Sequence, residues 1–268
     1  MPGLKTRLLM WLLVPASAGA ITLVSVQEEV EIGKQANAQM RREMPAFGDT
    51  QTNNYLRALG QQLTHAAPGP KYPYSFAVAD YREINAFALP GGPVWIHRGL
   101  LHAARTEAQV VGALSHEIAH VAQRHAADQL TKAMIANWGL SVLGAVLGNT
   151  GGAGATQVAA GFLANGVFMK FSRDDEREAD LVGLQIMKRA GWDPKGMIDL
   201  FEMLNGEQRA DPGKVAAFFS SHPSPQDRAA RLHAEVARTP GGRRDSLQFR
   251  TLKSRLLRMP APKAMPRG

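Results

Sequence analysis

The chain has 268 residues, a length that suits one large domain, and 45% of them are hydrophobic, enough for a substantial core. It contains no cysteine, which excludes a thiol nucleophile, a cysteine-ligated zinc finger and a disulfide framework. The net charge is +8, but residues 241–268 alone carry +7 of it. We therefore expect 241–268 to be a basic, flexible tail. We expect no nucleic-acid partner, because no nucleic-acid-binding motif accompanies this charge.

Residues 1–20 have the layout of a secretory signal peptide. Lys5 and Arg7 precede the apolar run 8–14, and a proline followed by small residues suits a signal peptidase. The other interpretation is an uncleaved anchor that reaches to about residue 26, because 8–26 is free of charge and about 20 residues span a bilayer. Both interpretations place the rest of the chain outside the cytoplasm, in the periplasm or cell envelope.

Two helices and a small sheet are expected before the central motif. Acidic residues near the start of 27–44 and a capping residue near the start of 50–67 indicate helices. Residues 74–79 alternate like a strand, and 86–89 and 93–97 are typical of extended segments on either side of a Pro-Gly-Gly turn.

The next helix is expected from Thr106 to about residue 130. Thr106 and Gln109 form a capping box, and apolar residues then repeat at helical spacing. Residues 133–169 contain no charged side chain and divide at a glycine-rich turn into halves that are short for a membrane span. We predict a buried or membrane-dipping helical hairpin there.

Three more helices are expected in the second half of the chain. Ser172 can cap a helix that runs to about residue 191, and Pro194 and Pro225 have the position that proline prefers at a helix start. The last of these helices is expected to end near residue 238.

The strongest chemical signal is the run His116-Glu117-Ile118-Ala119-His120. Histidines four residues apart on a helix lie on one face with Cβ atoms about 5–6 Å apart, so both rings can reach one zinc ion. Glu117 lies beside the metal without binding it. It can accept a proton from the water that zinc activates and pass it to the leaving amine.

Two histidines leave zinc short of one protein ligand. The metzincin pattern requires a glycine and a histidine where this chain has Gln123 and Ala126, so that class is excluded. His125, five residues after His120, would point about 140° around a continuous helix. We interpret it as a structural or solvated residue.

A carboxylate on a later helix is the remaining choice. Glu176 and Asp180 share a face at spacing i, i+4 within the acidic run 172–180. If Glu176 binds zinc, Asp180 can accept a hydrogen bond from the free N–H of a liganding histidine. Such an acidic run alone is more typical of a solvated helix face, but an upstream HExxH that lacks its third ligand favours the metal.

At this point the chain resembles the gluzincin metallopeptidases that include the CAAX prenyl protease, HtpX and the β-barrel-assembly-enhancing proteases. Within that family it is most similar to a compact, exported periplasmic branch, because it lacks the many membrane spans and the helical-repeat domain of other members. The matching motifs are Asn85–Gly92, Arg98–Leu101, His116–His120 with 124–127, the Ser-Arg…Glu…Ala-Asp element at 172–180, and His222-Pro223.

The resemblance implies a fold, a domain and site residues. The implied fold is α+β, mainly helical and zincin-like, with a small β-sheet beside the HExxH helix, in a metallopeptidase domain over 27–240. Glu176 would be the third zinc ligand. His222 would lie near the metal, either as an oxyanion stabiliser or as a latch that binds zinc, whereas the residues alone also allow a loop histidine with local hydrogen bonds. The residues Asn85, Ala86, Phe87 and Ala88 would bind substrate.

The substrate role has a physical basis as well, because an extended segment at a sheet edge can pair with a peptide as one more strand. An ordinary turn at the Pro-Gly-Gly is the alternative. We thus expect an endopeptidase with one Zn²⁺ per chain that acts on misfolded or mis-assembled envelope proteins. The alternative is a self-blocked zinc protein with a chaperone-like role. Protein or peptide substrates are the expected partners, with membrane-surface contact through 133–169 or the basic tail.

Overall fold

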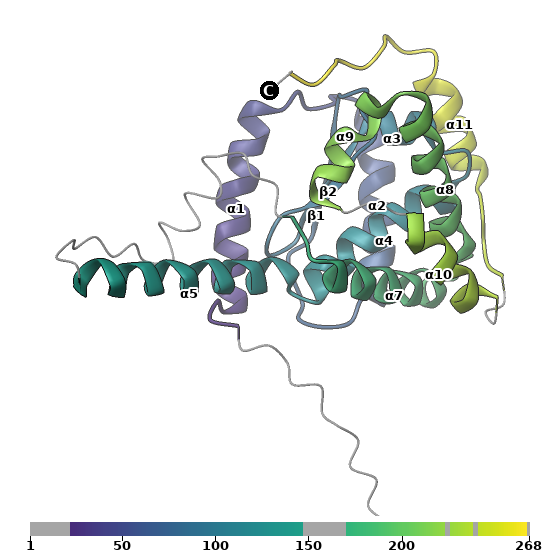
Figure 1. The fold of residues 1–268 in the computed structure, drawn as a ribbon. Helices are drawn as coiled ribbons and strands as arrows, with labels where there is room; N and C mark the ends of the chain where they lie inside the picture. The colour runs from purple at the N-terminus through teal and green to yellow at the C-terminus, as the bar shows by residue number, and fades with distance from the viewer. Residues whose placement is uncertain (1–21, 147–169, 223–225, 238–240, 267–268) are drawn as a thin grey trace, which may run out of the picture.

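The computed structural model describes residues 22–146, 170–222, 226–237 and 241–266, so the predicted signal segment 1–20 lies outside it. Helices predominate and the strands form one small sheet, which confirms the predicted fold class (Figure 1). The strands are β1 (Ser75–Ala79), β2 (Ala86–Ala88) and β3 (Pro93–His97). The helices are α1 (Val26–Glu43), α2 (Thr50–Ala66), α3 (Arg98–Ala103), α4 (Glu107–Ala122), α5 (His125–Val146), α7 (Arg173–Arg189), α8 (Lys195–Ala210), α9 (Pro212–Ser221), α10 (Gln226–Val236) and α11 (Leu247–Leu256).

The sheet leaves β2 at one edge, because the strand order is β1-β3-β2. β3 pairs in parallel with β1 and antiparallel with β2. Gly91, in the turn between β2 and β3, has φ 70°, which favours glycine, and a Cβ atom there would lie 2.4 Å from the Val30 Cα of α1. The turn is thus packed against α1, which positions the edge strand.

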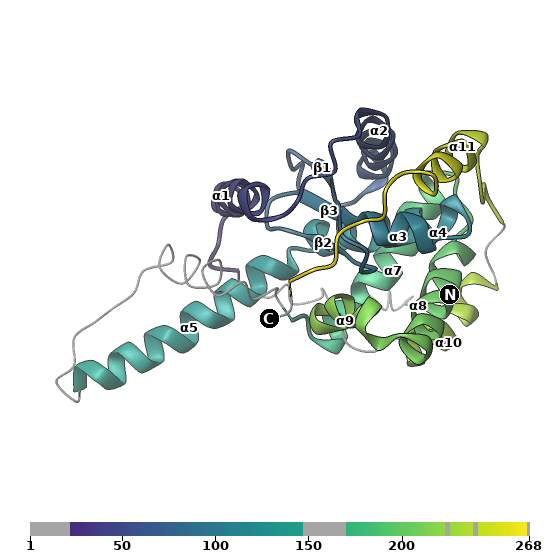
Figure 2. The same ribbon diagram turned by 90° about the horizontal axis from the view of Figure 1, so that it is seen from above.

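Helix α4 forms the centre of the molecule. Every residue from Glu107 to Ala122 is buried, as expected for a helix that is enclosed on all sides. Of the predicted capping box, the Gln109 half is formed, because the Gln109 side chain accepts from the Thr106 N–H at 3.1 Å. Helices α7 and α8 and strand β2 pack against α4, so the motif-bearing helix lies between a helical layer and the sheet edge (Figure 2).

The prediction that this helix continues to about residue 130 is wrong. It ends at Ala122, and Arg124 adopts φ 62°, in the left-handed region that non-glycine residues rarely occupy. The Arg124 side chain donates to Glu29 at 2.9 Å and to the Val24 carbonyl. Because Glu29 and Val24 belong to the α1 region, contacts distant in sequence hold this turn.

Helix α5 follows the turn and extends away from the other helices (Figures 1 and 2). Near its start, Ala127, Leu130 and Met134 pack against Val24. It corresponds to the first arm of the predicted hairpin, and the second arm lies outside the described residues. No helix in the described part of the chain is long and apolar enough to cross a membrane.

The prediction of a flexible basic tail is wrong for residues 241–266. Three side chains of α11, Phe249, Leu252 and Leu256, are buried in the main core. Several basic residues of the segment are paired: Arg244 with Asp193 and Asp199, Arg255 with Asp49, and Arg250 with Asp245. The positive charge therefore stabilises a folded segment.

Candidate metal centre and active site

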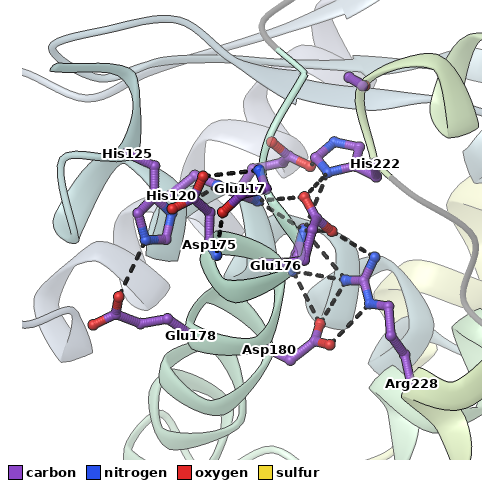
Figure 3. A network of polar contacts seen from close by, with 12 residues as sticks. Glu117, His120, His125, Asp175, Glu176, Glu178, Asp180, His222 and Arg228 are labelled. Atoms are coloured by element: carbon purple, nitrogen blue, oxygen red, sulfur yellow. Dashed lines mark hydrogen bonds and ion pairs between the residues drawn. The ribbon is translucent and has the colours of Figure 1, made fainter. Parts of the chain in front are cut away.

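Four buried side chains that could hold a metal ion meet beside α4. His116 and His120 lie on one face of that helix. Glu176 comes from α7, and His222 follows the last residue of α9 (Figure 3). All four are at most 2% exposed. The structure thus brings together the predicted ligands and adds His222 as a fourth donor.

The donor atoms of this cluster lie at separations close to those of a tetrahedral zinc site. The Nε2 atoms of His116 and His120 lie 3.0 Å apart. Oε1 of Glu176 lies 3.3 Å from His120 Nε2 and 2.8 Å from His222 Nδ1. His222 Nδ1 lies 3.4 Å from His116 Nε2. Zinc bonds of about 2.0–2.1 Å in tetrahedral geometry place ligand atoms about 3.3–3.4 Å apart, so the donor set fits this ion.

The two histidines of α4 differ in their affinity for a proton. Burial disfavours charge on His116, but hydrogen bonds to Asp180 and Glu176 outweigh it and raise the His116 pKa to about 9. Burial holds the His120 pKa well below its usual value. Burial would raise the pKa of Glu176, but the neighbouring histidines lower it, so this carboxylate is charged. The cluster therefore offers one anionic ligand.

Glu117 points into the same cluster from α4. Both of its carboxylate oxygens are buried, and no side chain among the described residues donates a hydrogen bond to them. The Nε2 atom of His222 lies 3.4 Å from Glu117 Oε1. Burial raises the Glu117 pKa. A buried carboxylate with a raised pKa and no fixed side-chain donor is suited to accept and release a proton.

Asp180 lies behind His116, as the i, i+4 spacing predicts. Its Oδ1 is 3.3 Å from the Nδ1 of His116. Arg228 of α10 donates to Asp180 at 2.6 and 2.8 Å and to Glu176 at 2.6 Å, and it is 2% exposed (Figure 3). Its guanidinium also lies over the Phe201 ring. The arginine neutralises two carboxylates that are enclosed in the core.

Arg228 is the main residue of the centre that sequence reasoning missed. It lies on the predicted last helix, six residues after His222, with no local pattern that distinguishes it. The available signal was the charge balance: two carboxylates buried in the core require cations, since unpaired buried charges are costly.

The structure also places two histidines whose interpretation was left open. His125 is buried and its Nδ1 lies 2.9 Å from the Nδ1 of His120, so it is structural rather than solvated, and it is not part of the four-donor cluster. The angular argument used for it assumed a continuous helix and was wrong. His222 was considered as a loop histidine, but its backbone belongs to the end of α9, because its N–H donates to the Phe218 carbonyl.

The predicted substrate-binding segment includes the edge strand. Ala86–Ala88 is β2, and Asn85 directly precedes it. His97 N–H donates to the Asn85 carbonyl, and Leu89 N–H donates to the Pro93 carbonyl. In an antiparallel ladder the bonded positions alternate, so the backbone groups of Ala86 and Ala88 face away from β3.

Comparisons with known proteins agree with this geometry. The model of peptidase family M48 matches residues 50–236. The beta-barrel assembly-enhancing protease of Escherichia coli K12 is 32% identical over 223 residues, which are 80% of this chain and 44% of that protein. The mitochondrial metalloendopeptidase OMA1 of Saccharomyces cerevisiae is 40% identical over 145 residues, 52% of this chain and 40% of that protein. The chain spans less than half the length of these relatives.

Proposed function

Because the chain belongs to peptidase family M48, we propose that it is a zinc-dependent endopeptidase that acts on misfolded or mis-assembled proteins of the cell envelope. The observation that carries this proposal is the buried cluster of three histidines and one glutamate, whose ligand atoms lie within 4.8 Å of one another, next to the buried carboxylate of Glu117. His116, His120 and Glu176 would hold the ion. The names of the relatives, a protease of β-barrel assembly and a metalloendopeptidase, support the substrate class.

Each side chain of the centre has its own role in the proposed hydrolysis. A bound zinc ion would activate water and polarise the scissile carbonyl. Glu117 accepts the proton of the attacking water and returns it to the leaving amine. Asp180 orients His116, and Arg228 offsets the charge of the Asp180 and Glu176 carboxylates. The enclosed site strengthens each of these electrostatic effects.

The edge strand is the proposed peptide-binding element. An extended substrate can pair with the outward backbone groups of Ala86 and Ala88. The Ala88 backbone lies close enough to the Glu117 carboxylate to lower the Glu117 pKa. A peptide paired with Ala88 would therefore lie next to the proposed catalytic base. At Ile84 the edge is occupied, because its N–H donates to the Lys214 carbonyl of α9 at 2.7 Å. Helix α9 therefore limits how far a paired peptide can extend on that side.

Metal removal tests the proposed activity. The purified protein is expected to degrade casein, to lose that activity with a chelator, and to regain it when zinc is added, because the proposed hydrolysis requires the ion. Casein fragments on a gel and zinc content by atomic absorption provide the measurements, with about one zinc per chain expected. A Glu176→Ala protein is the control that zinc should not restore. Full activity of that variant would show that Glu176 is not a ligand.

A second function is favoured by the position of His222. Because it supplies a fourth donor to the cluster, the centre can also be a blocked zinc site in a protein with a chaperone-like role in envelope assembly. That function predicts suppression of substrate aggregation that persists in a Glu117→Gln variant. Casein cleavage that depends on zinc would favour the endopeptidase.

The proposed location is the cell envelope, after export by the N-terminal segment. Its support is the basic, apolar and small-residue pattern of residues 1–20. Protein recovered from the envelope is expected to begin near Gly19 or Ile21, as N-terminal sequencing would show. An intact Met1 in the membrane fraction would contradict cleavage and favour the anchor.

We also propose membrane-surface contact by α5, which has no charged side chain after Lys132. The same fractionation would detect this contact.

A further inference from the structure

The Nδ1 atom of His120 faces a second histidine. His125 Nδ1 lies 2.9 Å from it, and His125 Nε2 lies 3.4 Å from Oε2 of Glu178 (Figure 3). His125 is 2% exposed, whereas the Glu178 side chain is 53% exposed. The three side chains thus form a line of contacts from the metal centre to the protein surface. The proposed function gives His125 and Glu178 no role.

The helix break before α5 produces this contact. Because Arg124 is in the left-handed conformation, the chain turns and His125 returns towards His120. Such a conformation costs free energy in a residue with a side chain, and it persists only where the surroundings enforce it. Here Glu29, 1% exposed, accepts from both Arg124 and Tyr72 and fixes the turn.

Hydrogen bonding assigns one proton arrangement to these rings. At 2.9 Å, one Nδ1 must donate and the other must accept. His120 Nε2 faces the other ligand atoms, so it must be unprotonated to bind metal. The neutral His120 ring therefore carries its proton on Nδ1 and donates it to His125. His125 then has its own proton on Nε2, which points at the Glu178 carboxylate.

Packing alone does not select this ring orientation. Phe171 stacks on the His120 ring with centroids 3.9 Å apart and an angle of 25°. Stacking fixes the plane of the imidazole. A flip of the ring by about 180° about the Cβ–Cγ bond would preserve that plane, because χ2 of histidine is roughly two-fold. The hydrogen bond to His125 distinguishes the two orientations, since only one of them directs Nε2 towards Glu176.

We propose that His125 and Glu178 are positioning residues that fix the tautomer and orientation of His120 for metal binding. The proposal rests on the proposed zinc site. It assigns to His120 what Asp180 supplies to His116, a hydrogen-bond acceptor behind the liganding ring. Glu178 also accepts from Gln123 and is half exposed, so its contribution is smaller than that of His125.

Zinc affinity of the His125 variants tests the proposal without an activity assay. A His125→Leu protein, which lacks an acceptor, is expected to bind zinc about 10–100-fold more weakly. A His125→Asn protein should recover most of the affinity, because the asparagine oxygen can occupy the place of Nδ1 and accept the bond. Competition with a fluorescent zinc chelator gives the affinity, and thermal melting of the metal-free proteins separates any loss of stability.

Two surface variants keep the test informative if His125→Leu does not fold. Glu178→Ala should weaken zinc binding several-fold, whereas Gln123→Ala, which removes the other partner of Glu178, should not. Wild-type affinity in both His125→Leu and Glu178→Ala would overturn the proposal, as would equal losses in His125→Leu and His125→Asn. If the wild-type protein itself binds no zinc, the proposed function fails. If wild type binds zinc and cleaves casein while all variants match it, only this inference fails.

Discussion

Replacing Glu117 with glutamine is expected to lower the rate of peptide hydrolysis by about 10²–10⁴-fold while zinc stays bound. An amide cannot accept the proton of the attacking water. The substitution preserves the shape of a side chain that is 1% exposed, and Glu117 is not one of the four clustered donors, so fold and metal should persist. Initial rates on a quenched peptide, together with zinc content, provide the measurement.

Glu107→Gln is a matched control for this substitution. Glu107 lies on the same helix, is 4% exposed and accepts a hydrogen bond from Tyr55, which glutamine can also accept. It lies almost three turns from Glu117, so its replacement should leave the rate unchanged. Near-normal turnover by Glu117→Gln would show that Glu117 is not the general base. An equal loss of rate in both variants would indicate a general effect on α4.

The sequence was sufficient to predict those parts of the metal centre that depend on helical periodicity. The capping box at Thr106 places the HExxH helix, and i, i+4 spacing puts His116 above His120 and Glu176 above Asp180. The spacing indicates which side chains share a helix face, but not which helix faces meet. The prediction that α4 meets α7 therefore came from the missing third ligand and from the family resemblance.

Features that depend on distant partners were not predictable. The Arg124 turn requires a buried acceptor on Glu29, which is 95 positions earlier, and local propensity favours helix continuation there. The folded segment 241–266 has a basic composition typical of a tail, yet its cations pair with acids such as Asp49 and Asp193 elsewhere in the chain. Tertiary partners of this kind override local patterns in both cases.

The position of His222 bears on whether the proposed metal centre would be open or blocked. Its Nδ1 lies 2.8 Å from Glu176 and 3.4 Å from His116, at the place of a fourth ligand, and its Nε2 lies 3.4 Å from Glu117. One imidazole would thus take the coordination position that catalysis requires to be open, and it lies near Glu117, the proposed general base, as well. The geometry favours a latch over an oxyanion donor.

His222→Ala is therefore expected to raise basal proteolysis, because removal of the imidazole opens the fourth position and frees Glu117. Casein cleavage by the variant and by wild type at equal zinc occupancy provides the measurement. A fall in rate of about 10²–10³-fold would instead assign His222 to the oxyanion. His233→Ala is the control, because that side chain is 55% exposed and pairs with Glu202 away from the centre. An unchanged rate with unchanged zinc affinity would leave His222 with local hydrogen bonds alone, and α9 would then serve only to limit the edge strand at Ile84.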